Sequence, residues 1–209
     1  MHVLAAVLLT QTKNAKPVTP KLTGPQVIDK MKAAVRAAVP ITGTETIATG
    51  RGEVNMNFKF MYPNLVYEAM DYGTNGTTEI HWSGGPIYSF FGAKGYRADD
   101  PPATGKPIHL GLIGFEHGFS DNNLYRNIGS CREEKFQGKK AYAIEVILAM
   151  GKNPGETLHV DAKTFLPLGV DESVGEVKVK VTYSDVKTHV PLKPADFMWV
   201  PAPSIPRIN

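Results

Sequence analysis

The sequence predicts a mainly β protein of the α+β class. We expect a curled antiparallel sheet forming an incomplete barrel, covered by an N-terminal amphipathic helix and a small central helical insert. A length of 209 residues suits one domain, and 20 glycines with 16 prolines favour many short strands and turns. Strict alternation supports this: over residues 176–183, the side chains on one face of the predicted strand are Val177, Val179, Val181 and Tyr183.

The first predicted element is a helix over Val27–Val39. Thr23 and Gln26 form a Thr-x-x-Gln capping box, and Pro25 lies in the first turn, where a missing N–H costs nothing. Pro40 ends the helix. Its apolar residues recur at helical spacing, at Val27, Ile28, Met31, Ala34, Val35, Ala38 and Val39.

The period changes to two from Thr44 onward, which predicts roughly nine to eleven strands linked by hairpins. Asp161 should accept hydrogen bonds from backbone N–H groups two or three residues later, in a turn that ends at Pro167. Residues 93–107 are expected to form a loop, and residues 108–128 a short helix or turn cluster. Further strands are expected at residues 53–60, 65–72, 77–82, 87–91, 130–136, 140–148 and on both sides of the 161–167 turn, with a short one near Phe197.

The N-terminal residues 1–20 are interpreted as a remnant signal segment and exposed lead-in, and residues 21–209 as a single domain. Val3–Leu9 resembles the apolar part of a secretory signal, although no Lys or Arg precedes it. A native apolar strand or tail is the alternative. No other apolar run approaches the roughly 18 residues of a membrane span.

Several classes of site lack support in the sequence. The net charge is +3 and basic residues do not cluster with aromatic ones, so no nucleic-acid partner is predicted. With Cys131 as the single cysteine, no internal disulfide can form. Ser184, Asp185 and His189 are the residue types of a nucleophilic triad but lack a Gly-x-Ser-x-Gly elbow. We therefore expect no enzyme activity, no cofactor and no metal site; no histidine pair has the i, i+4 spacing of ligands among His81, His109, His117, His159 and His189.

The remaining candidate site is apolar. Many Met and Phe side chains fall on predicted strand faces, and in a wide curled sheet they would suit either an ordinary core or a pocket that adapts to lipid chains. The sequence does not separate these two interpretations. The predicted ligand-contacting residues are Val27, Met31, Val35, Val54, Met56, Phe58, Phe60, Met70, Trp82 and Phe90.

Short motifs along the chain, from about Leu22 to Pro203, resemble the outer-membrane lipoprotein carrier family (the LolA/LolB-like fold). The predicted opening helix is similar to that of the family, and residues 60–66 (Phe-Met-Tyr-Pro-Asn-Leu-Val) are similar to its Arg-Pro-Asn turn. Residues 135–142 are similar to its Asn/Gln-Gly-x-x-x-Tyr hairpin, and residues 160–167 match its Asp-x-x-Thr-x-x-Pro connection. The order and spacing of these pieces carry the resemblance.

The resemblance implies an apolar cavity that shelters acyl chains of lipids or lipoproteins, with no catalysis, in a periplasmic or exported protein. Tyr62 stands where the carrier has the Arg that is important for directional transfer, so a relative that binds another lipid, or that senses lipoproteins, fits as well as a dedicated lipoprotein shuttle. The alternative is a lipoprotein-sensing or protein-interaction module on the same fold, without a lipid cavity. A monomer is expected, and a membrane-associated protein is a further candidate partner.

Overall fold

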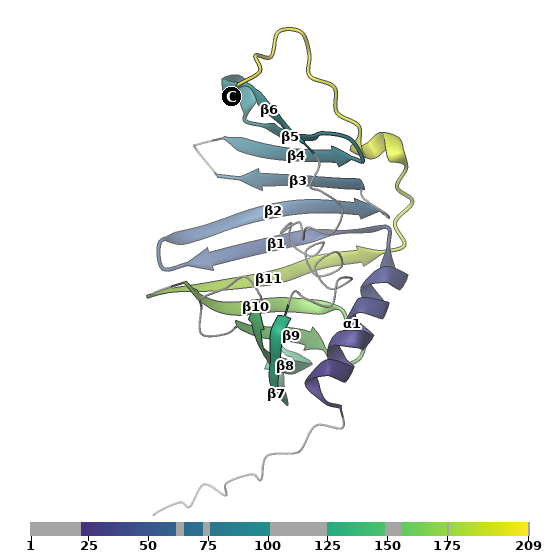
Figure 1. Ribbon diagram of the computed structural model, residues 1–209, viewed down its shortest axis with the longest axis vertical. Helices are drawn as coiled ribbons and strands as arrows, with labels where there is room; N and C mark the ends of the chain where they lie inside the picture. Colours follow the sequence, from purple (N-terminus) through teal and green to yellow (C-terminus); the bar gives the residue numbers. More distant parts are fainter. Residues whose placement is uncertain are drawn as a thin grey trace, which may run out of the picture.

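The computed structural model describes residues 22–61, 65–72, 76–100, 125–148, 156–174 and 176–208. They form one antiparallel sheet of eleven strands and a helix, α1 (Gly24–Ala38) (Figure 1). The strands are β1 (Ile41–Thr49), β2 (Gly52–Met61), β3 (Leu65–Asp71), β4 (Thr77–Ser83), β5 (Ile87–Phe90), β6 (Tyr96–Asp99), β7 (Tyr125–Phe136), β8 (Lys139–Leu148), β9 (Glu156–Asp161), β10 (Pro167–Val174) and β11 (Val177–Thr188). Two short 3₁₀ helices, η2 (Gly92–Lys94) and η3 (Pro194–Phe197), accompany them.

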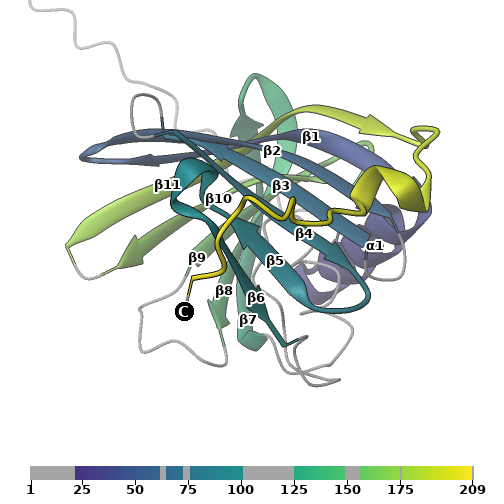
Figure 2. The same cartoon turned by 90° about the horizontal axis from the view of Figure 1, so that it is seen from above.

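The strand order is β6-β5-β4-β3-β2-β1-β11-β10-β9-β8-β7. Neighbours in the sheet are mostly neighbours in the chain, and the pairing of β1 with β11 joins the two halves. The sheet curls, so its halves face different directions when seen from above, while β6 and β7 remain its two ends (Figure 2). The predicted incomplete antiparallel barrel with an N-terminal helix is therefore confirmed.

Helix α1 forms where the sequence predicts it. The N–H of Thr23 donates to Oε1 of Gln26 at 2.9 Å, and the carbonyl of Thr23 accepts from the N–H of Val27 at 3.0 Å, which satisfies groups at the helix start. The helix lies against β7 and β8 and buries its apolar side chains Val27, Ile28, Met31, Val35 and Ala38. Burial of this face holds the helix on the sheet.

The predicted turn after β9 is also confirmed. Oδ1 of Asp161 accepts from the N–H groups of Lys163 and Thr164, at 2.8 and 2.9 Å. The carbonyl of Asp161 accepts from the N–H of Phe165 at 2.9 Å, and Phe165 has a positive φ of 58°. Between β7 and β8, Gln137 and Gly138 both have positive φ, as a two-residue hairpin turn requires.

Three expectations about local structure were wrong. Residues 96–99, predicted as loop, form β6, because they pair with β5. Residues 125–128 belong to β7 rather than to a helical or turn segment, because they pair with β8. The short strand expected near Phe197 is η3, in which Lys193 N–H bonds to Oδ2 of Asp196 at 2.7 Å. The rest of the predicted insert, residues 108–124, lies outside the described residues, as do Tyr62 and Asn75.

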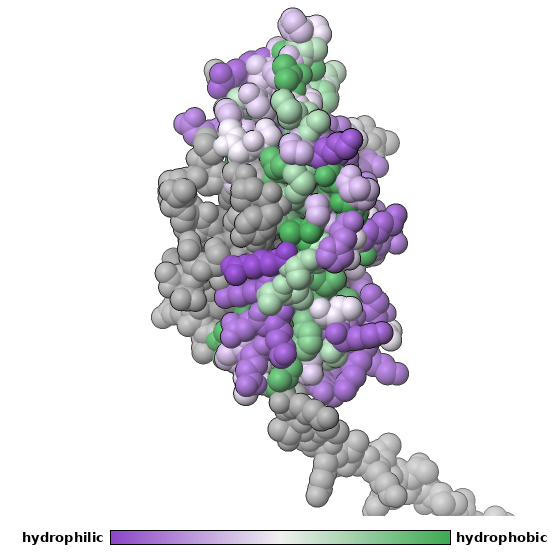
Figure 3. All heavy atoms as spheres, turned by 90° about the vertical axis from the view of Figure 1, so that its right-hand side faces the viewer, coloured by the Kyte–Doolittle hydropathy of each residue, from purple (hydrophilic) through white to green (hydrophobic). Residues whose placement is uncertain are grey.

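The C-terminal segment crosses β3 and β4 and reaches the outermost strand. Phe197 of η3 is fully buried, and η3 contacts β3 and β4. Further on, Tyr96 N–H donates to the carbonyl of Pro206 at 3.0 Å, and Ile208 N–H donates to the carbonyl of Tyr96 at 2.8 Å. This backbone pairing covers the outer edge of β6 and so satisfies groups that an edge strand would expose. On the side that carries α1 and η3, hydrophobic residues lie between hydrophilic ones (Figure 3).

Candidate functional site: the concave face of the sheet

The sheet has an apolar face and a polar face because its strands alternate. On β1 and β2, the cross-strand pairs Thr44–Asn57 and Thr46–Asn55 are joined by side-chain hydrogen bonds of 3.0 and 2.7 Å. The intervening residues point to the opposite face, where α1 packs. This concave face carries one continuous cluster of buried side chains from both halves of the sheet and from the helix.

Most of the predicted ligand-contacting residues lie together in this structure. Six of them belong to the concave cluster: Val27, Met31, Val35, Phe58, Phe60 and Trp82. Met56 is buried on the same strand face as Phe58. Val54, at the start of that face, is half-buried, and so is Met70, which is the cross-strand partner of Met56.

Phe90 lies apart from the other predicted residues. Phe90 pairs with Glu79, whose side chain lies on the opposite face of β4 from Trp82. Because Trp82 is on the concave face, Glu79 and Phe90 both point to the outer face of the sheet. There its ring lies 5.5 Å from the ring of Trp199 in the C-terminal segment. The rings of Tyr88 and Tyr96 also lie 5.5 Å from Trp199, so Phe90 belongs to an aromatic cluster that anchors this segment.

The concave cluster is larger than the area that α1 can cover. It extends from β4 to β8, and eight strands at about 4.8 Å spacing span about 34 Å. A helix of 15 residues is only about 22 Å long and about 10 Å wide. In Figure 1 α1 lies at one end of the strands rather than across their full length. One helix therefore does not span the whole of this cluster.

Two carboxyl groups interrupt the apolar face. Glu45 on β1 lies between Met56 and Tyr183, and Glu68 on β3 lies between Phe58 and Ile80. Their side chains are almost fully buried, with 4% and 2% of their surface exposed. Both therefore occupy positions where apolar residues would be expected.

The electrostatics of the pair follow from this burial. Burial raises the pKa of Glu45 to about 7. A hydrogen bond from Tyr183 has the smaller, opposite effect and lowers this pKa. Burial, and then the charge of Glu45, raise the pKa of Glu68 to about 8. Oε2 of Glu45 and Oε1 of Glu68 have no hydrogen-bond partner within the described ranges. Near neutral pH the two groups thus compete for protons in an apolar environment.

The outer face carries a separate polar cluster around His159. Its Nε2 lies 2.9 Å from Oδ2 of Asp171, and its Nδ1 lies 3.0 Å from Oε1 of Glu134, outside hydrogen-bond geometry. The imidazole stacks on the ring of Phe136 with 3.9 Å between centroids. These contacts fix the ring of His159 between Glu134 of β7 and Asp171 of β10.

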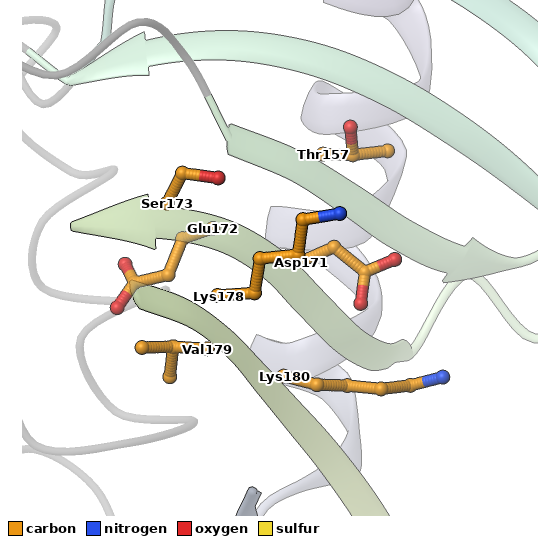
Figure 4. A pocket seen from close by; sticks show the side chains of 7 residues that line it. All are labelled: Thr157, Asp171, Glu172, Ser173, Lys178, Val179 and Lys180. Carbon is orange, nitrogen blue, oxygen red and sulfur yellow. The ribbon is translucent and has the colours of Figure 1, made fainter. Parts of the chain in front are cut away.

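A polar pocket of about 500 Å³ opens beside this cluster. Figure 4 shows its lining side chains on the ends of β9, β10 and β11. It contains carboxylates, ammonium groups and hydroxyl groups, which differ from the apolar lining that an acyl chain needs. The lining residues are Thr157, Asp171, Glu172, Ser173, Lys178, Val179 and Lys180.

Among the described residues, the structure gives no geometric support to the other candidate chemistries. In the part of the chain that the structure describes, no three His, Cys, Asp or Glu residues are arranged to hold a metal ion. Burial and the charge of Glu133 raise the pKa of the Cys131 thiol, the opposite of an activated nucleophile. Ser184 and Asp185 are exposed neighbours on β11. None of the helices described is long and apolar enough to cross a membrane.

Glu45 and Glu68 are the site residues that the sequence reasoning missed. A signal was present, because each carboxyl occupies the same strand phase as apolar residues. Glu68 lies on the same strand face as Val66 and Met70, and Glu45 lies on the same strand face as Ile41 and Ile47. An acidic residue within an apolar phase predicts a buried carboxyl once the strand face is known.

The described chain is thus an open, curled antiparallel sheet with a helix on its apolar concave face. No family model and no curated protein matches the sequence. Similar solved structures include LprF from Mycobacterium bovis, with 11% identity over 82% of this chain and 96% of that one, at a TM-score of 0.46. The lipoprotein LppX from Mycobacterium tuberculosis has 9% identity over 81% and 98%, at a TM-score of 0.46.

The LolA superfamily protein NE2245 from Nitrosomonas europaea is also similar, with 12% identity over 85% of this chain and 98% of that one, at a TM-score of 0.43. The name of this last protein contains that of the superfamily that the sequence motifs resemble. At these identities the likeness concerns the fold alone.

Proposed function

We propose that this protein binds the apolar chain of a lipid or lipoprotein on the concave face of its sheet, as a carrier without catalytic activity. The observation that carries the proposal is the continuous cluster of buried apolar side chains from β4 to β8, which is wider than the footprint of α1. Removing an acyl chain from water would drive binding, at about 0.8 kcal/mol per CH₂ group.

The proposed site includes the nine predicted residues on this side of the molecule and excludes Phe90. Because Phe58, Phe60 and Met31 are already buried, an entering chain has to replace existing contacts. Binding should therefore be coupled to an opening of the concave face. Flexible Met side chains such as Met31, Met56 and Met70 suit a site that adapts to its ligand.

A periplasmic or exported location, and action as a monomer, form part of the same proposal. They rest on the sequence motifs that resemble the lipoprotein carrier family. A membrane-associated protein that delivers or accepts the lipid is the partner that such a carrier would need.

The test is binding of a neutral apolar fluorescent probe, N-phenyl-1-naphthylamine, together with native mass spectrometry of the purified protein. We expect saturable probe binding and co-purified lipid. Phe58→Leu should weaken probe binding several-fold, because Phe58 lies in the concave cluster. The matched control is Phe136→Leu, which truncates a comparably buried ring on the outer face and should leave probe binding unchanged.

If the folded protein carries no lipid and binds no probe, carriage is refuted and the protein-interaction module remains. Equal loss of binding in both variants would also count against the proposal, because it would trace the effect to stability rather than to the concave face.

A further inference from the structure

The concave face contains two buried carboxyl groups that contribute nothing to the binding of an apolar chain. Glu45 and Glu68 stand on β1 and β3, on either side of β2, whose Met56 and Phe58 lie between them. Strands β1 and β3 are about 10 Å apart, a distance that two glutamate side chains can bridge. The pair thus forms a polar spot within the proposed ligand surface.

The described residues do not supply a hydrogen-bond donor to every carboxyl oxygen of this polar spot. Buried carboxyl oxygens normally accept hydrogen bonds, yet Oε2 of Glu45 and Oε1 of Glu68 accept none from the described chain. Tyr183 supplies a hydrogen bond to Glu45. Buried, unpartnered acceptors beside an apolar surface are the arrangement expected where a ligand brings its own donor.

The charges nearby favour a cationic donor over a neutral one. The interactions that act on the two carboxyl groups are the hydrogen bond from Tyr183 to Glu45 and the charge of Glu45, which opposes the ionisation of Glu68. An ammonium group between the carboxylates would relieve their mutual repulsion and donate three charge-assisted hydrogen bonds.

We propose that Glu45 and Glu68 bind the primary ammonium head group of an amphipathic ligand whose chain lies on the concave apolar face. This assignment rests on the proposed function, because it needs the chain to occupy the same face. The ligand class is therefore an amine-bearing lipid rather than a fatty acid. A carboxylate head group would meet two acidic side chains and be repelled.

The experiment compares three competitors of equal chain length against N-phenyl-1-naphthylamine: dodecylamine, dodecanol and dodecanoate. We expect dodecylamine to displace the probe at least about tenfold more effectively than the other two, because it alone pairs with the carboxylates. Its advantage should grow between about pH 5.5 and pH 8.5, since the pair ionises over this range while the amine stays cationic. Dodecanoate should change in the opposite direction.

Glu68→Gln tests the residue directly, because it keeps the size of the side chain and removes its charge. The advantage of dodecylamine over dodecanol should fall by about tenfold, with dodecanol unchanged. Glu53→Gln is the matched control, since Glu53 is an exposed carboxylate on β2, next to the site strands. It should bind all three competitors as the wild type does. Circular dichroism and thermal melting verify that both variants are folded.

The outcomes separate the two proposals. If the probe binds but the amine and the alcohol compete equally, or Glu68→Gln behaves as the wild type, the head-group assignment is refuted and apolar binding stands. If no probe binds, the proposed function fails; native mass spectrometry with dodecylamine then shows whether the pair binds an amine by itself. Absence of that complex overturns the assignment as well.

Discussion

Glu68→Gln should alter how the stability of the ligand-free protein depends on pH. The folded protein holds the proton of Glu68 up to a pKa of about 8, whereas the unfolded chain releases it near 4.5. The folded state therefore binds more protons than the unfolded state between these values, and stability falls as pH rises through this window. Below the window both states are protonated, and this contribution to stability is fully retained.

The size of the effect follows from the width of the window. A pH of 7 is about 2.5 units above the pKa of Glu68 in the unfolded chain, and each unit corresponds to about 1.4 kcal/mol, so Glu68 by itself should lower the stability of the wild type by about 3 kcal/mol relative to pH 4. Glutamine does not titrate. The variant should match the wild type near pH 4 within about 1 kcal/mol and exceed its stability by about 3 kcal/mol at neutral pH.

Urea unfolding at a series of pH values, followed by circular dichroism, measures this difference. The free energy of unfolding of the variant minus that of the wild type should rise steadily from about pH 4.5 to pH 8. The exposed Glu53→Gln control should give a constant difference. Parallel curves for Glu68→Gln and wild type would refute the reasoning, because they would mean that Glu68 titrates alike in the folded and unfolded chains.

Three further predictions concern the scaffold. Gly169→Ala should lower the free energy of unfolding by about 2 kcal/mol or more, because its Cβ would collide with the carbonyl oxygen of Val181; thermal or urea denaturation measures the loss. Asp161→Ala should cost about 1 kcal/mol in the same assay, since two backbone N–H groups lose their acceptor. Trp199→Ala should release the C-terminal segment from the outer face, where its indole stacks on His81; limited proteolysis with mass spectrometry should show faster cleavage after η3, with the melting temperature little changed.

Matched controls come from exposed positions. A Cβ at Gly50 meets nothing within 4 Å, so Gly50→Ala should leave stability almost unchanged. Lys163→Ala lies in the same turn as Asp161 but removes no acceptor. Met198 is 65% exposed, so Met198→Ala should not accelerate cleavage. If a control matched its test variant, the contact proposed for that variant would not be the cause.

The elements that sequence reasoning predicted well are those whose signal is local. The spacing of Val27, Met31 and Val35 defines one face of a helix, and Asp161 can reach two N–H groups within its own turn. Neither feature depends on a distant partner. The strand alternation around Phe58 is equally local, and it placed the concave face on the correct side of β2.

The features that were missed depend on contacts between distant segments. Tyr96 becomes part of a strand because β5 pairs with it on one side and the C-terminal segment on the other, at residue 207. Phe90 faces outward because its register with Glu79 sets its face, and a four-residue strand is too short to show its own alternation. In residues 65–71, apolar side chains occur in both phases, so the phase of Glu68 becomes visible only once the pairing with β2 is known.

The buried pair also bears on whether the concave face is only a core. A carboxyl group at the position of Glu68 destabilises the fold at neutral pH, and an apolar side chain of similar size would remove that cost. Selection for packing alone gives no reason to keep two such groups in contact with Phe58 and Tyr183. Local violations of this kind are expected where a protein meets a ligand, because the group that is costly in the empty protein supplies specificity in the complex. The pair therefore favours a binding surface over a purely structural core, and it does so independently of the size of the apolar face.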